Sequence, residues 1–229
     1  MCLLPYMTFA HLASIYRNYD IRGHYPEEIN KTECYKIALA LAKLYKPKQV
    51  LLCRDIRTSG TILRDGLAAG FTDAEVTIID AGVTTTPMSY FLGSHTDSDM
   101  SVMITASHMP AQFNGLKICI NDARPLSADE IKTLESEVSR IPDECESCEL
   151  SFQKVDGQPD WQQYLHTKKL ATSFSGTIVV DPANMVGGIE IKTLMSVLSN
   201  ATITAIYDEF DELTPNHEAN PIKLETLDD

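Results

Sequence analysis

A hydroxyl nucleophile, an imidazole and an amine fall within one short segment, residues 105–117, as Ser107, His108 and Lys117. A serine–histidine–aspartate hydrolase fits this pattern poorly, because a histidine next in sequence cannot easily turn back on its neighbour. The Gly-x-Ser-x-Gly elbow of such hydrolases is also missing. His108 has two interpretations: it orients or shuttles protons at Ser107, or it only bonds nearby backbone.

Two strands are expected to position this segment. The apolar run at 99–104 predicts a buried strand, and residues 116–120 resume the alternation of a second strand. Pro110 and the Asn114-Gly115 pair predict turns between them. We therefore expect an antiparallel pair with Ser107 on the connecting loop, where reactive groups are usually displayed.

Four cations lie in short segments that are expected to form loops or the turns next to them: Arg22, Arg54, Arg57 and Lys117. The chain as a whole carries a net charge of −13, so an anionic ligand would be repelled unless cations gather locally. These four residues could form such a local field. The alternative is that they are ordinary solvated surface cations.

Four further segments accompany the serine segment in a fixed order: Tyr19–Gly23, Arg54–Ser59, Asp181–Asn184 and Pro215–Pro221. Together, the five segments resemble landmarks of the alpha-D-phosphohexomutases, the phosphomannomutase and phosphoglucomutase family. The resemblance runs from about residue 15 to the last residue. It covers the first domain and most of the second domain of a four-domain enzyme.

The resemblance implies that Ser107 is carried as phosphoserine. It would pass its phosphoryl group to a hexose monophosphate and recover one from the bisphosphorylated intermediate, exchanging the 1-phosphate and 6-phosphate, with a hexose 1,6-bisphosphate as activator. Lys117 would donate to a phosphoryl oxygen or take the hydroxyl proton, whereas Arg22 stays protonated and stabilises charge. The implied catalytic residues are Ser107, His108, Lys117 and Arg22, and the implied substrate-binding residues are Tyr19, Arg22, Arg54, Arg57 and Lys117.

Mg²⁺ is the cofactor that the resemblance implies, and in the family an Asp-Gly-Asp-x-Asp-Arg string after the Pro-Asn-His segment holds it. This sequence contains no such string, which leaves Ser107, through its phosphate, as the expected ligand. Two interpretations follow. The chain is a truncated phosphohexomutase without turnover, or it is a non-catalytic sugar-phosphate-binding or scaffold fragment that pairs with a separate C-terminal polypeptide.

Composition limits the partners and the location. The 229 residues are 44% hydrophobic, enough for a core in one or two domains. The acidic balance, with a pI near 4.8, argues against nucleic acid and anionic membranes as partners. Residues 1–14 lack a basic n-region and no uninterrupted apolar run approaches about 18 residues, so we expect a cytoplasmic protein without a membrane span.

Strands and helices alternate along the chain, which predicts an α/β layered domain with a mixed sheet. We expect an N-terminal extension at 1–14, this domain at 15–140, a linker at 141–159, and a second, incomplete α/β domain of similar layout at 160–229. The expected helices are 28–45, 59–71 (capped by Thr58 or Ser59), 86–92, 127–140 (with a Ser127/Glu130 capping box), 160–170 and 188–198. The further expected strands are 50–53, 76–80, 176–180 and 201–207.

The cysteines give no disulfide framework. Cys34, Cys53 and Cys119 stand inside apolar patterns and are expected to be reduced core residues. Cys145 and Cys148 have a metal-type spacing, but no second Cys or His pair lies nearby in sequence, so zinc is not expected.

Overall fold

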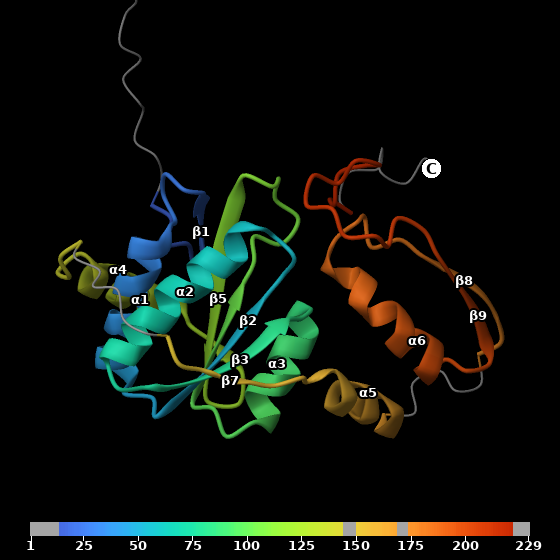
Figure 1. Ribbon diagram of the computed structural model, residues 1–229, viewed down its shortest axis with the longest axis horizontal. Helices are drawn as coiled ribbons and strands as arrows, with labels where there is room; N and C mark the ends of the chain where they lie inside the picture. The colour runs from blue at the N-terminus through green and yellow to red at the C-terminus, as the bar shows by residue number, and fades with distance from the viewer. Residues whose placement is uncertain (1–13, 144–149, 169–173, 222–229) are drawn as a thin grey trace, which may run out of the picture.

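A mixed β-sheet forms the centre of the first part of the protein (Figure 1). The structure, a computed structural model, describes residues 14–143, 150–168 and 174–221. Within these residues the strand order is β1-β5-β4-β2-β3-β7, with β6 added beside β5. The strands are β1 (Ile21–His24), β2 (Gln49–Arg54), β3 (Thr77–Val83), β4 (Met100–Ile104), β5 (Phe113–Ile120), β6 (Arg124–Pro125) and β7 (Gln153–Lys154).

Strand directions confirm the mixed sheet that the sequence predicts. β2 runs parallel to both β3 and β4, while β5 runs antiparallel to β4 and to β1. The β4–β5 pair therefore forms the expected hairpin around the serine segment. Because parallel strands end at one edge, the loops after β2, β3 and β4 converge there, and this is where ligands bind in such sheets.

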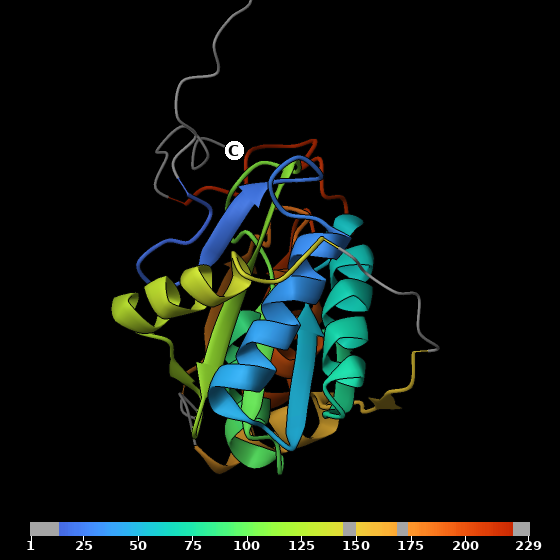
Figure 2. The ribbon, with the colours of Figure 1, turned by 90° about the vertical axis from the view of Figure 1, so that its left-hand side faces the viewer.

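Helices cover both faces of the sheet. α1 (Lys31–Tyr45), α2 (Ser59–Asp73) and α4 (Ala128–Val138) lie together on one face, toward the viewer in Figure 2. α3 (Thr86–His95) lies on the other face and packs against α5 (Gln158–Thr167). Trp161 of α5 packs against Phe91 of α3 in a tilted arrangement, with 5.3 Å between ring centroids, so α5 belongs to the packing of the first sheet.

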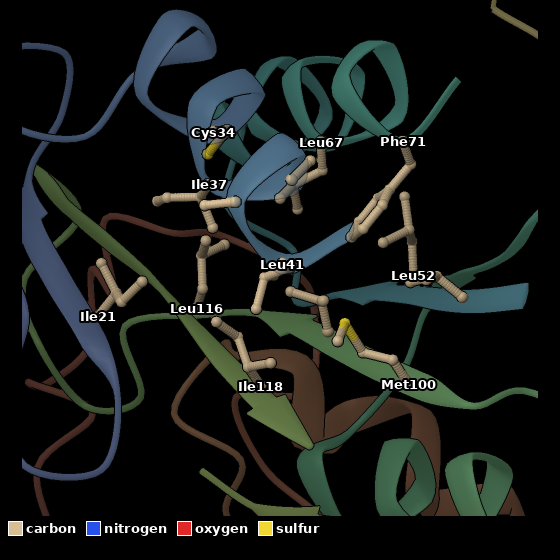
Figure 3. Close-up of a cluster of buried hydrophobic side chains, with 14 of the residues drawn as sticks. Ile21, Cys34, Ile37, Leu41, Leu52, Leu67, Phe71, Met100, Leu116 and Ile118 are labelled. Atoms are coloured by element: carbon tan, nitrogen blue, oxygen red, sulfur yellow. The ribbon is translucent and has the colours of Figure 1, made fainter. Parts of the chain in front are cut away.

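The main core fills the space between the sheet and α1 and α2 (Figure 3). Ile37, Leu41, Leu67 and Phe71 point from these helices onto the strands and are fully buried. Each such side chain stabilises the fold by roughly 1.5–3 kcal/mol relative to leaving it exposed. This buried apolar layer fixes the positions of the strands, and the loops at the sheet edge extend from the ends of those strands.

Glycine allows α1 and α2 to pack in close contact. A Cβ on Gly66 would lie 2.3 Å from the carbonyl oxygen of Lys31, and one on Gly70 would lie 2.4 Å from that of Tyr35. No side chain fits at these distances. The helix backbones touch here because these two positions have none.

Helix caps follow the sequence in part. The Ser127/Glu130 capping box of α4 is confirmed, with both reciprocal bonds present. At α2 the expected side-chain cap is wrong: Thr58 is the N-cap residue, but its hydroxyl makes no cap bond. The hydroxyl donates instead to Glu212, 2.6 Å away, from a segment 154 residues further along the chain.

The sheet corrects two local expectations and adds one strand. Residues 141–159 are more than a linker, because Gln153 and Lys154 pair with β3 as an edge strand. The opening segment contains β1, which the pattern had not indicated. Asn114 and Gly115 do not turn the chain but lie in β5, since Gly115 leaves room for β1: a Cβ there would be 2.2 Å from the carbonyl oxygen of Ile21.

The second part of the chain forms a smaller α/β unit. β8 (Gly176–Val180) and β9 (Ala201–Ala205) pair in parallel, as expected from two apolar segments. The single helix predicted at 188–198 is instead a 3₁₀ turn, η1 (Val186–Glu190), followed by α6 (Ile191–Val197). Among the described residues, the outer edges of β8 and β9 have no strand partner, and Val179 of β8 is 61% exposed.

Cys34, Cys53 and Cys119 are buried and free, which confirms them as core thiols. Burial raises the pKa of Cys53 to about 12 and that of Cys119 to about 11, so both stay protonated at neutral pH. Cys145 and Cys148, like residues 1–13, lie outside the described residues. No helix in the described part of the chain is long and apolar enough to cross a membrane.

Candidate active site

Ser107 lies shortly after the end of β4 at Ile104, on the loop of the β4–β5 hairpin, with backbone in the left-handed region at φ 59°. A chain of hydrogen bonds holds it there. The amide of Ser107 donates to Thr105 Oγ1 at 2.9 Å, and the Thr105 hydroxyl donates to Asp55 Oδ2 at 2.7 Å. Because a serine rarely adopts this conformation unaided, the surrounding bonds must impose it.

Arg57 is the central support of the loop, and its side chain is only 1% exposed. Its guanidinium also contacts the carboxylate of Asp55, with Nε 3.3 Å from Oδ2. The terminal nitrogens donate to four backbone carbonyls of the serine loop, those of Ser107 (2.9 Å), Met109 (2.6 Å), Pro110 (2.8 Å) and Phe113 (3.1 Å). The sequence interpretation of Arg57 as a substrate-binding residue therefore does not match its placement, since its donors hold the loop.

Asp55 belongs to the Arg-Asp-x-Arg-Thr-Ser segment, although the sequence alone does not indicate a role for it. It is 1% exposed and connects Arg57 to Thr105. Burial raises the pKa of Asp55 above its ordinary value, while the hydrogen bond from Thr105 and the charge of Arg57 oppose this shift. Its place between two loop-holding residues makes it a buried anchor.

Arg22 and Lys117 meet through a shared carboxylate. Asp20 Oδ2 accepts from the Arg22 guanidinium at 2.7 Å and from Lys117 Nζ at 3.2 Å. The pairing of β1 with β5 brings them together, because Arg22 lies opposite Gly115, two residues before Lys117. The three groups carry one net positive charge, and Asp20, a residue that the sequence motif does not mark as functional, keeps the two cations adjacent.

The other predicted residues differ in their contacts and exposure. Arg54 donates weakly to the carbonyl oxygen of Asp55 at 3.4 Å, and its buried Nε has no hydrogen-bond partner among the described residues. Tyr19 is 73% exposed. His108 Nδ1 lies 3.4 Å from Ser107 Oγ, so the structure does bring these two neighbours together.

A cleft of about 420 Å³ opens beside Ser107, between the serine loop and the second unit. Ser107 and His108 are the predicted catalytic residues among its described lining; the predicted cations at 22, 54, 57 and 117, and Tyr19, lie outside it. The lining consists of Asp55, Thr86, Thr105, Ser107, His108, Asp181–Ala183, Met185, Val186 and His217–Pro221. The two landmark segments of the second unit thus face the serine loop.

Those two landmark segments are bonded to each other. The Asn216 side chain donates to Asn184 Oδ1 at 2.8 Å, and His217 Nε2 lies 2.7 Å from Asp181 Oδ2. The Asn184 side chain in turn donates to the carbonyl oxygen of Glu209 at 2.8 Å. The far wall of the cleft is therefore one bonded assembly rather than two independent loops.

Two carboxylates of the second unit hold it against the first. Glu212 accepts from the amide and hydroxyl of Thr58 at 2.9 and 2.6 Å. Glu190 accepts from the hydroxyl of Thr85 at 2.6 Å and from the indole of Trp161 at 2.9 Å. Thr58 and Thr85 are the N-cap residues of α2 and α3, so both contacts lie at the sheet edge that carries the site.

The described residues do not supply a magnesium site. No group of three or more His, Cys, Asp or Glu side chains is placed in them to hold a metal ion. Asp55, the carboxylate on the serine-loop side of the cleft, is bonded to Arg57 and Thr105. Mg²⁺ requires several oxygen ligands in a near-octahedral shell, which these groups do not form.

The fold and the site define an α/β protein that displays a serine on a hydrogen-bonded loop at the edge of a mixed sheet. The chain belongs to the phosphoglucomutase/phosphomannomutase family: residues 13–144 match the family's alpha/beta/alpha domain I. This match contains the first sheet's strands β1 to β6 and the whole serine loop.

Similar proteins agree with this assignment. The chain is 27% identical over 230 residues to a phosphomannomutase of Escherichia coli, covering 95% of this chain and 50% of that protein. It is 29% identical to a phosphoglucomutase of Neisseria meningitidis, with 94% and 47% covered. A crystal structure of a phosphoglucomutase/phosphomannomutase family protein from Burkholderia thailandensis matches with a TM-score of 0.81 and 26% identity, over 93% of this chain and 48% of that one. The chain thus spans about half the length of these relatives.

Proposed function

We propose that this chain provides the phosphoryl-carrying half of a phosphohexomutase. Ser107 takes up a phosphoryl group from a hexose 1,6-bisphosphate and transfers it to a hexose monophosphate, which exchanges the 1-phosphate and the 6-phosphate. The names of the relatives support this class of reaction. In this proposal the phosphorylated hexose occupies the cleft beside Ser107.

The observation that carries the proposal is the fixed position of Ser107. Phosphoryl transfer needs little covalent chemistry from the protein and depends mainly on in-line positioning and charge stabilisation. Arg57 and Thr105 hold the backbone on both sides of Ser107, and the side chain borders the cleft. The loop therefore does not have to reorganise when its hydroxyl oxygen gains or loses a phosphoryl group.

The neighbouring cations take supporting roles in this proposal. Arg22 stabilises charge on the transferring group, since a guanidinium stays protonated. Lys117 donates to a phosphoryl oxygen or accepts the proton of the sugar hydroxyl. Asp20 holds both of them at the strand pair next to the loop, and His108 orients the Ser107 hydroxyl from 3.4 Å.

Intact-mass spectrometry after incubation with glucose 1,6-bisphosphate tests the proposal. The chain should gain the mass of one phosphoryl group, and Ser107→Ala should abolish the gain. Ser136→Ala is the matched control, because Ser136 is exposed on α4, outside the cleft lining, and should leave the gain unchanged. No mass gain in the unmodified chain, or a gain that survives Ser107→Ala, would rule out Ser107 as the carrier.

A further inference from the structure

His217 occupies an unusual position in the far wall of the cleft. Its Nε2 lies 2.7 Å from Asp181 Oδ2, and its Nδ1 lies 2.9 Å from the carbonyl oxygen of Glu218. A carboxylate and a carbonyl oxygen only accept hydrogen bonds. A neutral imidazole carries one N–H and satisfies one of these acceptors, whereas the doubly protonated imidazolium satisfies both.

The charges of the side chains around the cleft indicate what a protonated His217 would do. The carboxylates among the described lining residues are those of Asp55, Asp181 and Glu218, and the side chains able to carry positive charge are His108 and His217. A phosphoserine at position 107 adds about −1.5 to −2 charges to the same space. Without a cation beside it, the carboxylate of Asp181 would repel the phosphoryl group.

We propose that His217 is a positively charged positioning residue that neutralises Asp181 and thereby lets the cleft accept a phosphoryl group on Ser107. The pair also joins the two landmark loops of the second unit, so the neutralised carboxylate stays at a fixed place opposite the serine loop. The effect on Ser107 rests on the proposed function, whereas the protonation state of His217 does not.

Imidazole ¹⁵N and ¹³C NMR of histidine-labelled protein tests the protonation state directly. At about pH 7.5 an unperturbed imidazole, with a pKa near 6.5, is mostly neutral. The signal that His217→Gln removes should be that of an imidazolium. His166, whose Nε2 faces the hydroxyl of Ser196 at 2.7 Å, is the matched control for comparison. A neutral His217 signal would overturn the inference.

The variant Asp181→Asn tests whether Asp181 sets the protonation state of His217, and it leaves the histidine in place. Asp181 Oδ1 accepts from the Ala183 amide at 2.7 Å, a bond that an asparagine oxygen can keep. The new amide nitrogen then faces His217 and donates to its Nε2. His217 should convert to the neutral tautomer protonated at Nδ1. An unchanged imidazolium signal in this variant would show that Asp181 does not set its charge.

Phosphoryl uptake at Ser107 tests the consequence. His217→Gln should slow uptake from glucose 1,6-bisphosphate roughly tenfold, the order expected when one uncompensated carboxylate acts on a dianion across a solvated cleft. The double variant Asp181→Asn/His217→Gln should restore the rate, and His166→Gln should not change it. Uptake that is absent in the unmodified chain refutes the proposed function, whereas normal uptake that is insensitive to His217→Gln, or is not restored in the double variant, refutes this inference.

Discussion

The residues at the serine loop have two kinds of role: some face the cleft and are placed to react, and others hold the loop backbone in position. Ser107 faces the cleft, whereas Arg57 points away from solvent and binds the carbonyls of the loop. An arginine is suited to this because its planar fork of five donors reaches several acceptors at once. The position of Ser107 therefore depends on Arg57, a buried side chain that does not line the cleft.

Arg57→Lys should lower the free energy of unfolding by about 2–4 kcal/mol, because an ammonium cannot reach four carbonyls and Asp55 together, and each lost bond to a charged group costs about 1.5–3 kcal/mol. Urea unfolding measures this. Arg17→Lys, at an exposed position, should change stability by less than about 0.5 kcal/mol. Equal effects of the two variants would contradict the role assigned to Arg57.

The sequence shows which residues cluster in motifs, but not what their side chains face. Ser107 on a hairpin loop could be predicted, because the flanking strands have a clear apolar pattern. The donors of Arg57 could not, since loop carbonyls carry no sequence signal. The turn predicted at Asn114-Gly115 was wrong for a related reason. The dipeptide is typical of turns, but here the glycine is needed because β1 packs closely against β5 at this position.

At the level of elements, stability depends on close helix contacts and on helix caps. α1 and α2 touch where α2 has glycine, and α4 begins with a complete capping box. Neither feature lies in the cleft lining, yet both fix the helix layer behind the sheet that carries the loop. Disturbing them should change folding before it changes chemistry.

Gly66→Ala should destabilise the protein by about 2–4 kcal/mol, since the added Cβ meets the Lys31 carbonyl oxygen at 2.3 Å and must push two helices apart. Gly60→Ala is the control on the same helix. Its Cβ would find only ordinary contacts, at 3.6 Å or more, and alanine favours helix by up to about 1 kcal/mol. Thermal unfolding should therefore rank Gly60→Ala at or above the unmodified chain and Gly66→Ala well below it.

Glu130→Gln should destabilise α4 in a pH-dependent way. The Arg124 side-chain bond, followed by the bonds from Ser127, lowers the pKa of Glu130 to about 2 from an ordinary value of 4.5. A lowered carboxyl pKa contributes stability above pH 4.5 that is lost as the pH falls toward 2. The stability difference from the unmodified chain should be of the order of 1 kcal/mol at pH 7 and shrink across that interval.

Urea midpoints measured between pH 7 and pH 3 would show this dependence. Asp129→Asn is the control, since Asp129 is 96% exposed and lies 3.9 Å from its lysine partner. A difference between Glu130→Gln and the unmodified chain that grows with acidity would contradict the assignment.

For the whole molecule, the decisive feature is how the second unit is seated on the first. Glu212 and Glu190 reach the N-cap threonines of α2 and α3, and between these contacts the cleft opens beside Ser107. The shape of the cleft is therefore set by a few hydrogen bonds at its rim. These contacts join residues more than 100 positions apart, which is why the sequence pattern gave no sign of them.

Glu190→Ala should loosen this seating and expose Trp161, the one tryptophan of the chain, whose indole donates to Glu190 at 2.9 Å. Acrylamide should quench the fluorescence of the variant more strongly than that of the unmodified chain. Glu209→Ala, which alters an exposed side chain of the same unit, should leave quenching unchanged. Equal quenching in all three proteins would show that Glu190 does not hold α5.

The β8–β9 pair has a consequence for how the protein behaves in concentrated solution. Parallel strands are normally covered on both faces, and open strand edges are templates for pairing with other chains. Val179 is 61% exposed on a strand whose outer edge has no partner in the described residues. Light scattering should show self-association that rises with concentration, and Val179→Lys should suppress it through charge repulsion at the edge.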